Sequence, residues 1–246
     1  TSIASKYYVS KKIPIEKKRW GLLPDKLNIL LKNTQNIHKF VDNIGDSGGV
    51  INFNNKGNKC LLRFGIEQTG KNSFINCMNN VFEDNIIKAI VNNIDPILFN
   101  SLNNGNLVNI YKKNIPRKLK EYNDIENFIK WCTKYNLLEK EIIEKNIRSD
   151  KIYNNKIKRL LTLYSAFNNF KDYLLDDSID KNMNDFYDLF TRKIEWLFSN
   201  GLNILIFSRF SEKPKDIFIQ CPKHNRPDYY FDKNKPTLLI LKSDNY

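Results

Sequence analysis

The order in which two hydrophobic periods occur limits the fold of this chain more than any other feature. Between residue 73 and about residue 198, apolar residues recur at the spacing of amphipathic helices. After Gly201 the pattern changes to short β-rich runs, separated by loops that contain Pro, Lys and Asp. These runs are Leu202–Phe207, Ile217–Cys221 and Thr237–Leu241. Helices followed by strands favour an α+β fold over an alternating α/β fold, and the runs predict a meander, which is a C-terminal antiparallel sheet.

Pro, Gly and capping residues mark where the helices begin and end. Helices are predicted at about residues 24–31, 73–93 with a polar break, 96–102, 124–135, 155–175 and 184–198. Asp124 is the expected N-cap of its helix, and Gly201 follows the expected C-terminus of the last one. Residues 103–106 read as a turn, residues 45–57 as a loop rich in Gly and Asn, and Leu61–Phe64 as a short strand.

The chain is long enough to form a core without help from metals or disulfides. It has 246 residues, of which 41% are hydrophobic. No internal repeat or clear domain boundary interrupts it. The polar residues 1–18 predict an N-terminal arm, and residues 19–246 a single α+β domain. Because the sequence begins and ends abruptly, with Tyr246 just after a strand-like run, we expect a fragment of a longer protein.

The chain is strongly basic, with a net charge of +13 and a pI near 9.4. Such a surface favours polyanions, which include nucleic acid, acidic partners and anionic membranes. The positive charge lies in short clusters, and the candidate nucleic-acid contacts are Lys17, Lys18, Arg19, Lys158 and Arg159. The alternative interpretation is a Lys-rich surface that only keeps the protein in solution.

The four cysteines indicate a reducing compartment, because they are widely spaced and none forms a CxxC pair. The N-terminus lacks a signal pattern, and no apolar run approaches the roughly 20 residues of a membrane span. We therefore expect a soluble intracellular protein that does not contact a membrane.

The sequence predicts neither a cofactor nor a metal. It contains no P-loop, dinucleotide fingerprint, pair of catalytic carboxylates or RNA-recognition signature. Cys221 and His224 have metal-like spacing, but a zinc site needs a second pair of ligands.

Two further clusters leave alternatives open. Asp176, Asp177 and Asp180 could bind a cation or form a solvated loop. Residues 229–231 read Tyr-Tyr-Phe beside basic residues, so they either stack on single-stranded nucleic acid or pack into the core of the sheet.

Residues 65–78, GIEQTGKNSFINCM, carry most of the chemical information. A glycine-containing loop leads into a helix whose first residue is the small polar Ser73. A nucleophile belongs at such a helix N-terminus, which lowers a thiol pKa and offers backbone N–H groups to an oxyanion. Gln68, a few residues upstream, could supply a second oxyanion donor.

This segment resembles the cysteine box of the ubiquitin-specific proteases, roughly Gly-Leu-x-Asn-x-Gly-Asn-Thr-Cys-Tyr-x-Asn, and more loosely that of the ovarian-tumour-type deubiquitinases. In the resemblance, Gln68 falls on the oxyanion Asn and Ser73 on the nucleophilic Cys. A histidine is expected after the last strand, where this chain has Asn245. The resemblance implies a papain-like fold, a helical lobe followed by an antiparallel sheet. Without thiol and base, it implies a pseudoenzyme that acts as a deubiquitinase-like interaction module.

Two alternatives remain at this stage. The chain could be a ubiquitin-directed cysteine peptidase, either with its nucleophile replaced by an engineered Ser73 or with Cys77 acting together with His224. It could also be a basic nucleic-acid-binding protein in which an ordinary amphipathic helix matches the cysteine box by chance.

Two other runs resemble a region of large proteins of nucleocytoplasmic large DNA viruses, some of them described as the large subunit of a viral early transcription factor. They are residues 19–24, RWGLLP, and residues 99–108, FNSLNNGNLV. The abundance of Asn, Lys and Ile, whose codons are AT-rich, agrees with a giant virus as the source. The resemblance implies a virion-packaged module, found in the host cytoplasm, the viral factory or the virion. Its partners would be transcription machinery, a ubiquitin-like protein or nucleic acid.

Overall fold

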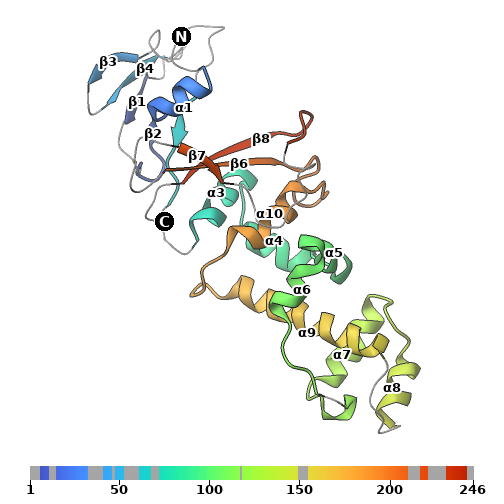
Figure 1. Ribbon diagram of the computed structural model, residues 1–246. Helices are drawn as coiled ribbons and strands as arrows, with labels where there is room; N and C mark the ends of the chain where they lie inside the picture. The colour runs from blue at the N-terminus through green and yellow to red at the C-terminus, as the bar shows by residue number, and fades with distance from the viewer. Residues whose placement is uncertain are drawn as a thin grey trace, which may run out of the picture. The chain divides into compact units, whose positions relative to one another are not determined.

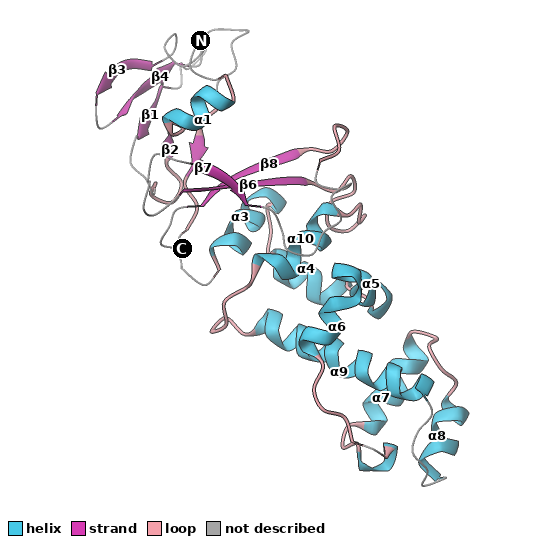
Figure 2. Cartoon of the chain, in the orientation of Figure 1, coloured by secondary structure: helices cyan, strands magenta, loops and turns pink. Residues whose placement is uncertain are grey.

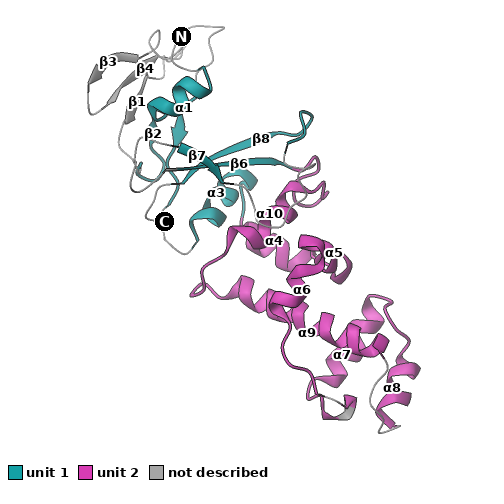
Figure 3. Cartoon of the chain, in the orientation of Figure 1, with its two compact units in different colours: residues 1–84, 202–222, 231–246 teal, residues 85–201, 223–230 magenta. Residues whose placement is uncertain are grey.

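The computed structural model describes residues 6–10, 15–32, 41–45, 48–52, 61–67, 72–116, 118–148, 155–209, 217–220 and 231–242. The chain is a mixture of helices and two small sheets, which confirms the predicted α+β class (Figure 2). It divides into two compact units (Figure 3). Unit 1 contains residues 1–84, 202–222 and 231–246, and unit 2 contains residues 85–201 and 223–230. The single domain expected from residue 19 to 246 stays a prediction.

Unit 1 holds a five-stranded sheet in the order β3-β4-β1-β2-β5. Its strands are β1 (Lys6–Ser10), β2 (Trp20–Gly21), β3 (Val41–Gly45), β4 (Gly48–Asn52) and β5 (Arg63–Phe64). Only β1 and β2 are parallel, and the other pairs are antiparallel. The loop predicted for residues 45–57 is therefore wrong where β4 forms, whereas the arm predicted for residues 1–18 stays a prediction. In β4, pairing across the sheet overrides the poor strand propensity of Gly and Asn.

The second sheet of unit 1 consists of β6 (Asn203–Arg209), β7 (Ile217–Gln220) and β8 (Thr237–Lys242) in the order β7-β6-β8. The three strands lie where the sequence predicted them. The predicted antiparallel arrangement is wrong, however, because only β7 is antiparallel to β6 whereas β8 is parallel to it.

Asn203 explains the parallel pairing of β6 with β8. Its side chain is almost fully buried at the start of β6, and its Nδ2 donates to the carbonyl of Asp232 at 2.7 Å and to Oγ1 of Thr237 at 3.1 Å. Its backbone N–H donates to the carbonyl of Pro236 at 2.8 Å. These bonds hold the beginning of β8 beside the beginning of β6, so the two strands must run in the same direction.

Two helices complete the described part of unit 1. Helix α1 (Asp25–Leu30) follows Pro24, as predicted, and α3 (Ser73–Phe82) buries Ile75 and Met78. Glu83 ends α3 in the left-handed conformation, with φ of 61°. The polar break in the predicted 73–93 helix is thus the end of one helix, and a separate helix begins in unit 2.

Unit 2 is helical in its described residues (Figure 1). Its elements are α4 (Ile86–Asn93), α5 (Pro96–Ser101), η1 (Leu102–Gly105), α6 (Asn106–Tyr111), η2 (Leu119–Glu121), α7 (Ile125–Lys134), α8 (Lys140–Arg148), α9 (Asn155–Leu175) and α10 (Met183–Thr191). Helix α9 has the predicted bounds, and α4, α5, α6 and α7 all pack on it. Helix α8 was not predicted. Among the described residues, no helix is long and apolar enough to cross a bilayer.

Local hydrogen bonds set several of these helix ends. The side chain of Asn85 accepts a bond from the backbone of Lys88 and begins α4, and Asp95 caps α5 in the same way through Leu98. The helix predicted for residues 184–198 ends early, at Thr191. There the chain folds back so tightly that a Cβ on Gly201 would lie 2.5 Å from the carbonyl oxygen of Thr191.

The turn before β2 packs against Gly65 in unit 1. The backbone N–H of Lys18 donates to the carbonyl of Gly65, and the N–H of Gly65 donates to the carbonyl of Arg19, both at 2.8 Å. A Cβ at Gly65 would lie only 1.9 Å from the carbonyl oxygen of Glu16. The glycine that begins the box-like segment is therefore required by close backbone approach.

The change Gly65→Ala should destabilise the protein by about 3 kcal/mol, because backbone atoms must move to admit the methyl group. Gly105→Ala is the matched control. A Cβ there has its nearest contact at 3.5 Å, so only the left-handed conformation at φ of 82° is penalised, by about 1–2 kcal/mol. Urea denaturation followed by circular dichroism measures both values. Equal losses of stability would contradict the close approach at Gly65.

Candidate functional site

The box-like segment places Ser73 as the first residue of α3, which is the position expected for a nucleophile. Its other two predicted members, Gln68 and Asn245, lie outside the described residues. His38 and His224, the two histidines of the chain, also lie outside them. Whether Ser73 faces Asn245 with Gln68 beside it stays a prediction.

The hydroxyl of Ser73 is buried. Its Oγ and the neighbouring Oδ1 of Asn72 have no hydrogen-bond partner among the described residues. A buried hydroxyl without a partner loses its hydration, which destabilises the fold. A serine also needs an adjacent base to become a nucleophile, and the described surroundings of Ser73 supply none.

The thiol of Cys77 does not suit the alternative role of nucleophile. It lies on α3, one turn after Ser73, and burial raises its pKa to about 11. At neutral pH the thiol therefore stays protonated, whereas a catalytic cysteine needs a lowered pKa. Cys132, on α7 in unit 2, is fully buried and its pKa is raised to about 12.

Two residues of the box-like segment have structural roles in this fold. Gly65 admits the carbonyl of Glu16, and Nδ2 of Asn76 donates to the carbonyl of Glu67 at 3.2 Å, which ties α3 to the segment before it. Local packing thus accounts for part of the pattern that resembles a peptidase.

The first predicted basic cluster is largely neutralised within unit 1. Nζ of Lys17 lies 2.5 Å from Oε2 of Glu67, and Nε of Arg19 lies 3.5 Å from Oε2 of Glu16. These pairs are about half exposed or more, so they contribute little stability, but they reduce the charge that is offered to a polyanion. Lys18 is the member of this cluster without an ion pair among the described residues.

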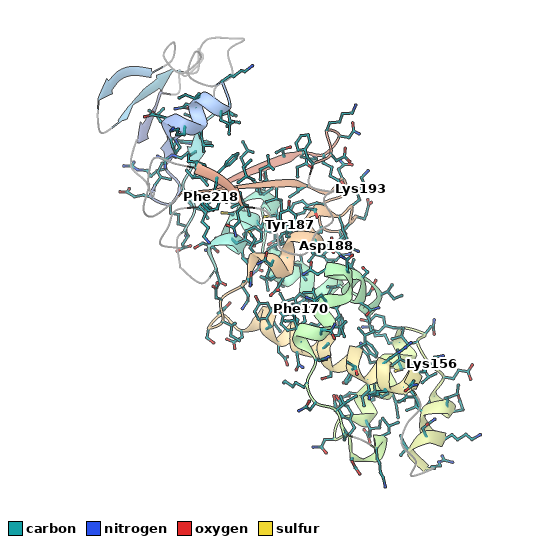
Figure 4. All side chains as sticks on the ribbon, in the orientation of Figure 1. Lys156, Phe170, Tyr187, Asp188, Lys193 and Phe218 are labelled. Atoms are coloured by element: carbon teal, nitrogen blue, oxygen red, sulfur yellow. The ribbon has the colours of Figure 1, made fainter. Side chains whose placement is uncertain are left out.

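The second predicted cluster stays open to solvent. Lys158 and Arg159 lie exposed near the beginning of α9, where Ile157 points into the core of unit 2. Neither makes an ion pair among the described residues. Lys156, in the same turn, is also exposed (Figure 4).

Positive and negative charges are separated along unit 2. Residues 112–171 contain fifteen Lys and Arg but only seven Asp and Glu. We call this segment the basic segment. Residues 172–195 contain seven acidic residues and three basic ones, and we call them the acidic segment.

A lysine is buried in the first loop of the acidic segment. Lys181 is 4% exposed, and its Nζ donates to the carbonyls of Asp176 and Ile179 and lies 4.8 Å from the ring centre of Tyr173. Asp176, Asp177 and Asp180 raise the pKa of Lys181, against a larger lowering by desolvation. An internal ammonium thus occupies the centre of the loop proposed as a cation site. No group of three metal-ligating side chains occurs among the described residues.

A second part of the acidic segment belongs to a polar network that the sequence did not reveal. Oδ2 of Asp188 accepts bonds from the backbone N–H of Asn103 at 2.8 Å and from Nη2 of Arg192 at 2.7 Å. The hydroxyl of Tyr111 donates to Asp185 at 2.7 Å, and its pKa is strongly raised by burial and by this carboxylate. The Asn-Asn-Gly run at residues 103–105 was the available signal, because the left-handed turn that it forms leaves backbone N–H groups that need acceptors.

The change Asp188→Ala should lower the free energy of unfolding by about 1–3 kcal/mol, because it removes the acceptor of Asn103 and the carboxylate beside Arg192. Asp172→Ala, a change at an exposed acid on α9, should have an effect within about 0.5 kcal/mol. Urea denaturation measures both variants. A loss for Asp188→Ala no larger than that of the control would show that the network does not hold η1 to α10.

Cys77 should be alkylated at pH 7.5 about 100 times more slowly than an ordinary thiol, because a pKa raised from 9 to about 11 lowers the thiolate fraction by that factor. Iodoacetamide labelling with peptide mapping measures the rate at this position alone. In 8 M urea the rate should reach that of a free thiol. Rapid labelling of the folded protein would instead mark Cys77 as an activated nucleophile.

Comparisons with protein-family models, with curated proteins and with solved structures give no match.

Proposed function

We propose that this chain is a non-catalytic binding module that contacts nucleic acid through the basic segment of unit 2. The observation that carries the proposal is the separation of charge within that unit. Exposed lysines and arginines outnumber acids on the basic segment, whereas the acids in excess lie on the acidic segment, where Asp185 and Asp188 are held by internal partners.

Nucleic acid is the polyanion that fits this distribution best. A phosphate backbone presents closely spaced negative charges over many ångströms, and neutralising them releases counterions. The cations of the basic segment come from several elements, α7, α8 and α9 among them, so they offer an extended surface. Lys158 and Arg159 are part of it, as the sequence predicted.

The non-catalytic part of the proposal rests on α3. Ser73 has a buried hydroxyl without a base among its described neighbours, and the thiol of Cys77 is held protonated. Ser73 at the helix start supports the interpretation of this segment as a degenerate papain-like site, in a fold whose C-terminal sheet departs from the expected antiparallel form. A ubiquitin-directed peptidase would need both a cysteine at position 73 and a base.

A module of this kind suits the setting that the second resemblance implies. In a virion-packaged transcription protein, a basic helical unit would hold the protein on nucleic acid while other parts contact the transcription machinery. We propose a giant DNA virus as the source, and transcription machinery or a ubiquitin-like protein as the protein partner.

Two triple variants test the proposal, because each removes three positive charges. Lys156→Gln, Lys158→Gln and Arg159→Gln together should weaken binding of a fluorescent 20-nucleotide single strand at least about 10-fold. They should also reduce the steepness of the plot of log K against log salt concentration by about 2, since each lost phosphate contact reduces that slope by roughly 0.7. Fluorescence anisotropy at several salt concentrations measures both effects.

The matched control is Lys17→Gln, Lys18→Gln and Arg19→Gln. It changes the net charge equally, but Glu67 and Glu16 already neutralise two of its three cations. Its effect should stay below about 3-fold. Equal losses for the two triple variants would indicate a nonspecific charge effect, and no binding by the unaltered chain would refute the proposal.

A further inference from the structure

Helices α7 and α9 bring two lysines of the basic segment together. Asp124, just before α7, accepts a bond from the hydroxyl of Tyr164 on α9. Further along both helices, Trp131 contacts Phe167, with ring centres 6.2 Å apart. The contacts advance along both helices in the same direction, so Lys134 and Lys171, each about one turn beyond this contact, lie on the same side of the interface, and Lys134 acts electrostatically on Lys171.

Each of these lysines lies over an aromatic ring. Nζ of Lys134 is 5.2 Å from the ring centre of Tyr135, and Nζ of Lys171 is 4.7 Å from that of Phe167. Trp131 contacts both rings, with its centre 5.9 Å from Tyr135 and 6.2 Å from Phe167. The cations and rings therefore form one continuous cluster, which we call the lysine–aromatic cluster.

The cluster lacks negative charge. Neither Lys134 nor Lys171 makes an ion pair within the described parts of the chain, and the pKa of Lys171 is lowered by desolvation and by Lys134. Two like charges near each other cost free energy, which the faces of the rings offset only in part. An anion between the two ammonium groups would remove this repulsion.

Trp131 links the two halves of the cluster from below the surface. The residue is 8% exposed, and its ring contacts those of Tyr135 and Phe167. The groups that the cluster offers to a ligand are therefore the two ammonium groups, which can only donate hydrogen bonds. The complementary ligand is an anion rich in acceptors, as a phosphate is.

We propose that the lysine–aromatic cluster is a phosphate-binding site for single-stranded nucleic acid, an inference that rests on the proposed function. Lys134 and Lys171 hold one backbone phosphate between them. Tyr135, which is half-buried, presents part of its ring beside that phosphate as a stacking surface for a base. Aromatic rings next to cations favour single strands, because the bases of a duplex are not free to stack on protein side chains.

The test is a double variant, Lys134→Gln with Lys171→Gln, measured by anisotropy with a fluorescent oligothymidylate of 20 nucleotides. Its affinity should fall at least about 10-fold. The slope of log K against log salt concentration should become less steep by about 1. The matched control, Lys88→Gln with Lys193→Gln, removes two exposed cations that lie outside the basic segment and should weaken binding less than about 3-fold. Because the first pair of changes relieves repulsion, the thermal midpoint of that variant should stay equal or rise.

Changes at Tyr135 test the stacking surface separately. Tyr135→Phe should keep the affinity within about 2-fold, whereas Tyr135→Ala should lower it about 5-fold or more. A 20-base-pair duplex should bind the unaltered chain more weakly than the single strand and be insensitive to Tyr135→Ala.

The outcomes separate this inference from the proposed function. If the unaltered chain binds the oligonucleotide but the Lys134/Lys171 double variant binds it equally well, the cluster is not a phosphate site and the proposed function stands. If the unaltered chain does not bind at all, both proposals fail. Equal sensitivity of duplex and single strand to Tyr135→Ala would overturn the assignment to single strands.

Discussion

The aromatic face of α9 is the constraint on which unit 2 depends. Phe170 is fully buried and lies between rings from three other elements, with centres 5.2 Å from Phe99, 5.1 Å from Tyr111 and 6.4 Å from Phe186. Burying one such ring stabilises the fold by about 1.5–3 kcal/mol. Because α5, α6 and α10 all supply partners to this one side chain, the position of α9 sets the positions of the others.

Packing on α9 also decides where the charges of unit 2 lie. The network around Asp185 and Asp188 ties α10 to η1 and α6, and it keeps two carboxylates inside the unit. In the neighbouring acidic loop, the ammonium group of Lys181 donates to the backbone carbonyls of Asp176 and Ile179. The cations of the basic segment have fewer internal partners, so they face the solvent. The excess of exposed cations on the basic segment leaves a positive surface there, which is the physical origin of the proposed nucleic-acid contact.

Two residues of the box-like segment are explained by their backbone contacts, without any catalytic role. Gly65 lies where any side chain would meet the carbonyl of Glu16, and Asn76 binds the backbone of Glu67. A glycine and an asparagine at these places are expected from backbone contacts, whether or not chemistry was ever performed there. The buried hydroxyl of Ser73 has no comparable structural explanation among the described residues.

The sequence by itself determined the elements whose apolar period is long or whose ends carry strong signals. The bounds of α9, the start of α5 at Pro96, and the three strands β6, β7 and β8 follow from local pattern, because period and turn chemistry act within a few residues. Asp124 precedes α7 as predicted, but its side chain makes no cap bond to the helix backbone. The basic cluster of Lys158 and Arg159 was also predicted from the local sequence, and both residues are exposed. Helix α8 was not predicted. Ile143 is its one fully buried residue, so its apolar face is short and gives a weak periodic signal.

Only the tertiary structure decided which distant residues meet. Strands β1 and β4 form through pairing with each other, and β8 runs parallel to β6 because Asn203 binds the turn before it. The neutralisation of Lys17 and Arg19, and the approach of Lys134 to Lys171, likewise join residues that no local pattern connects. Such contacts depend on the summed packing of whole elements, and this is why charge and period alone predicted the basic surface but not the cluster within it.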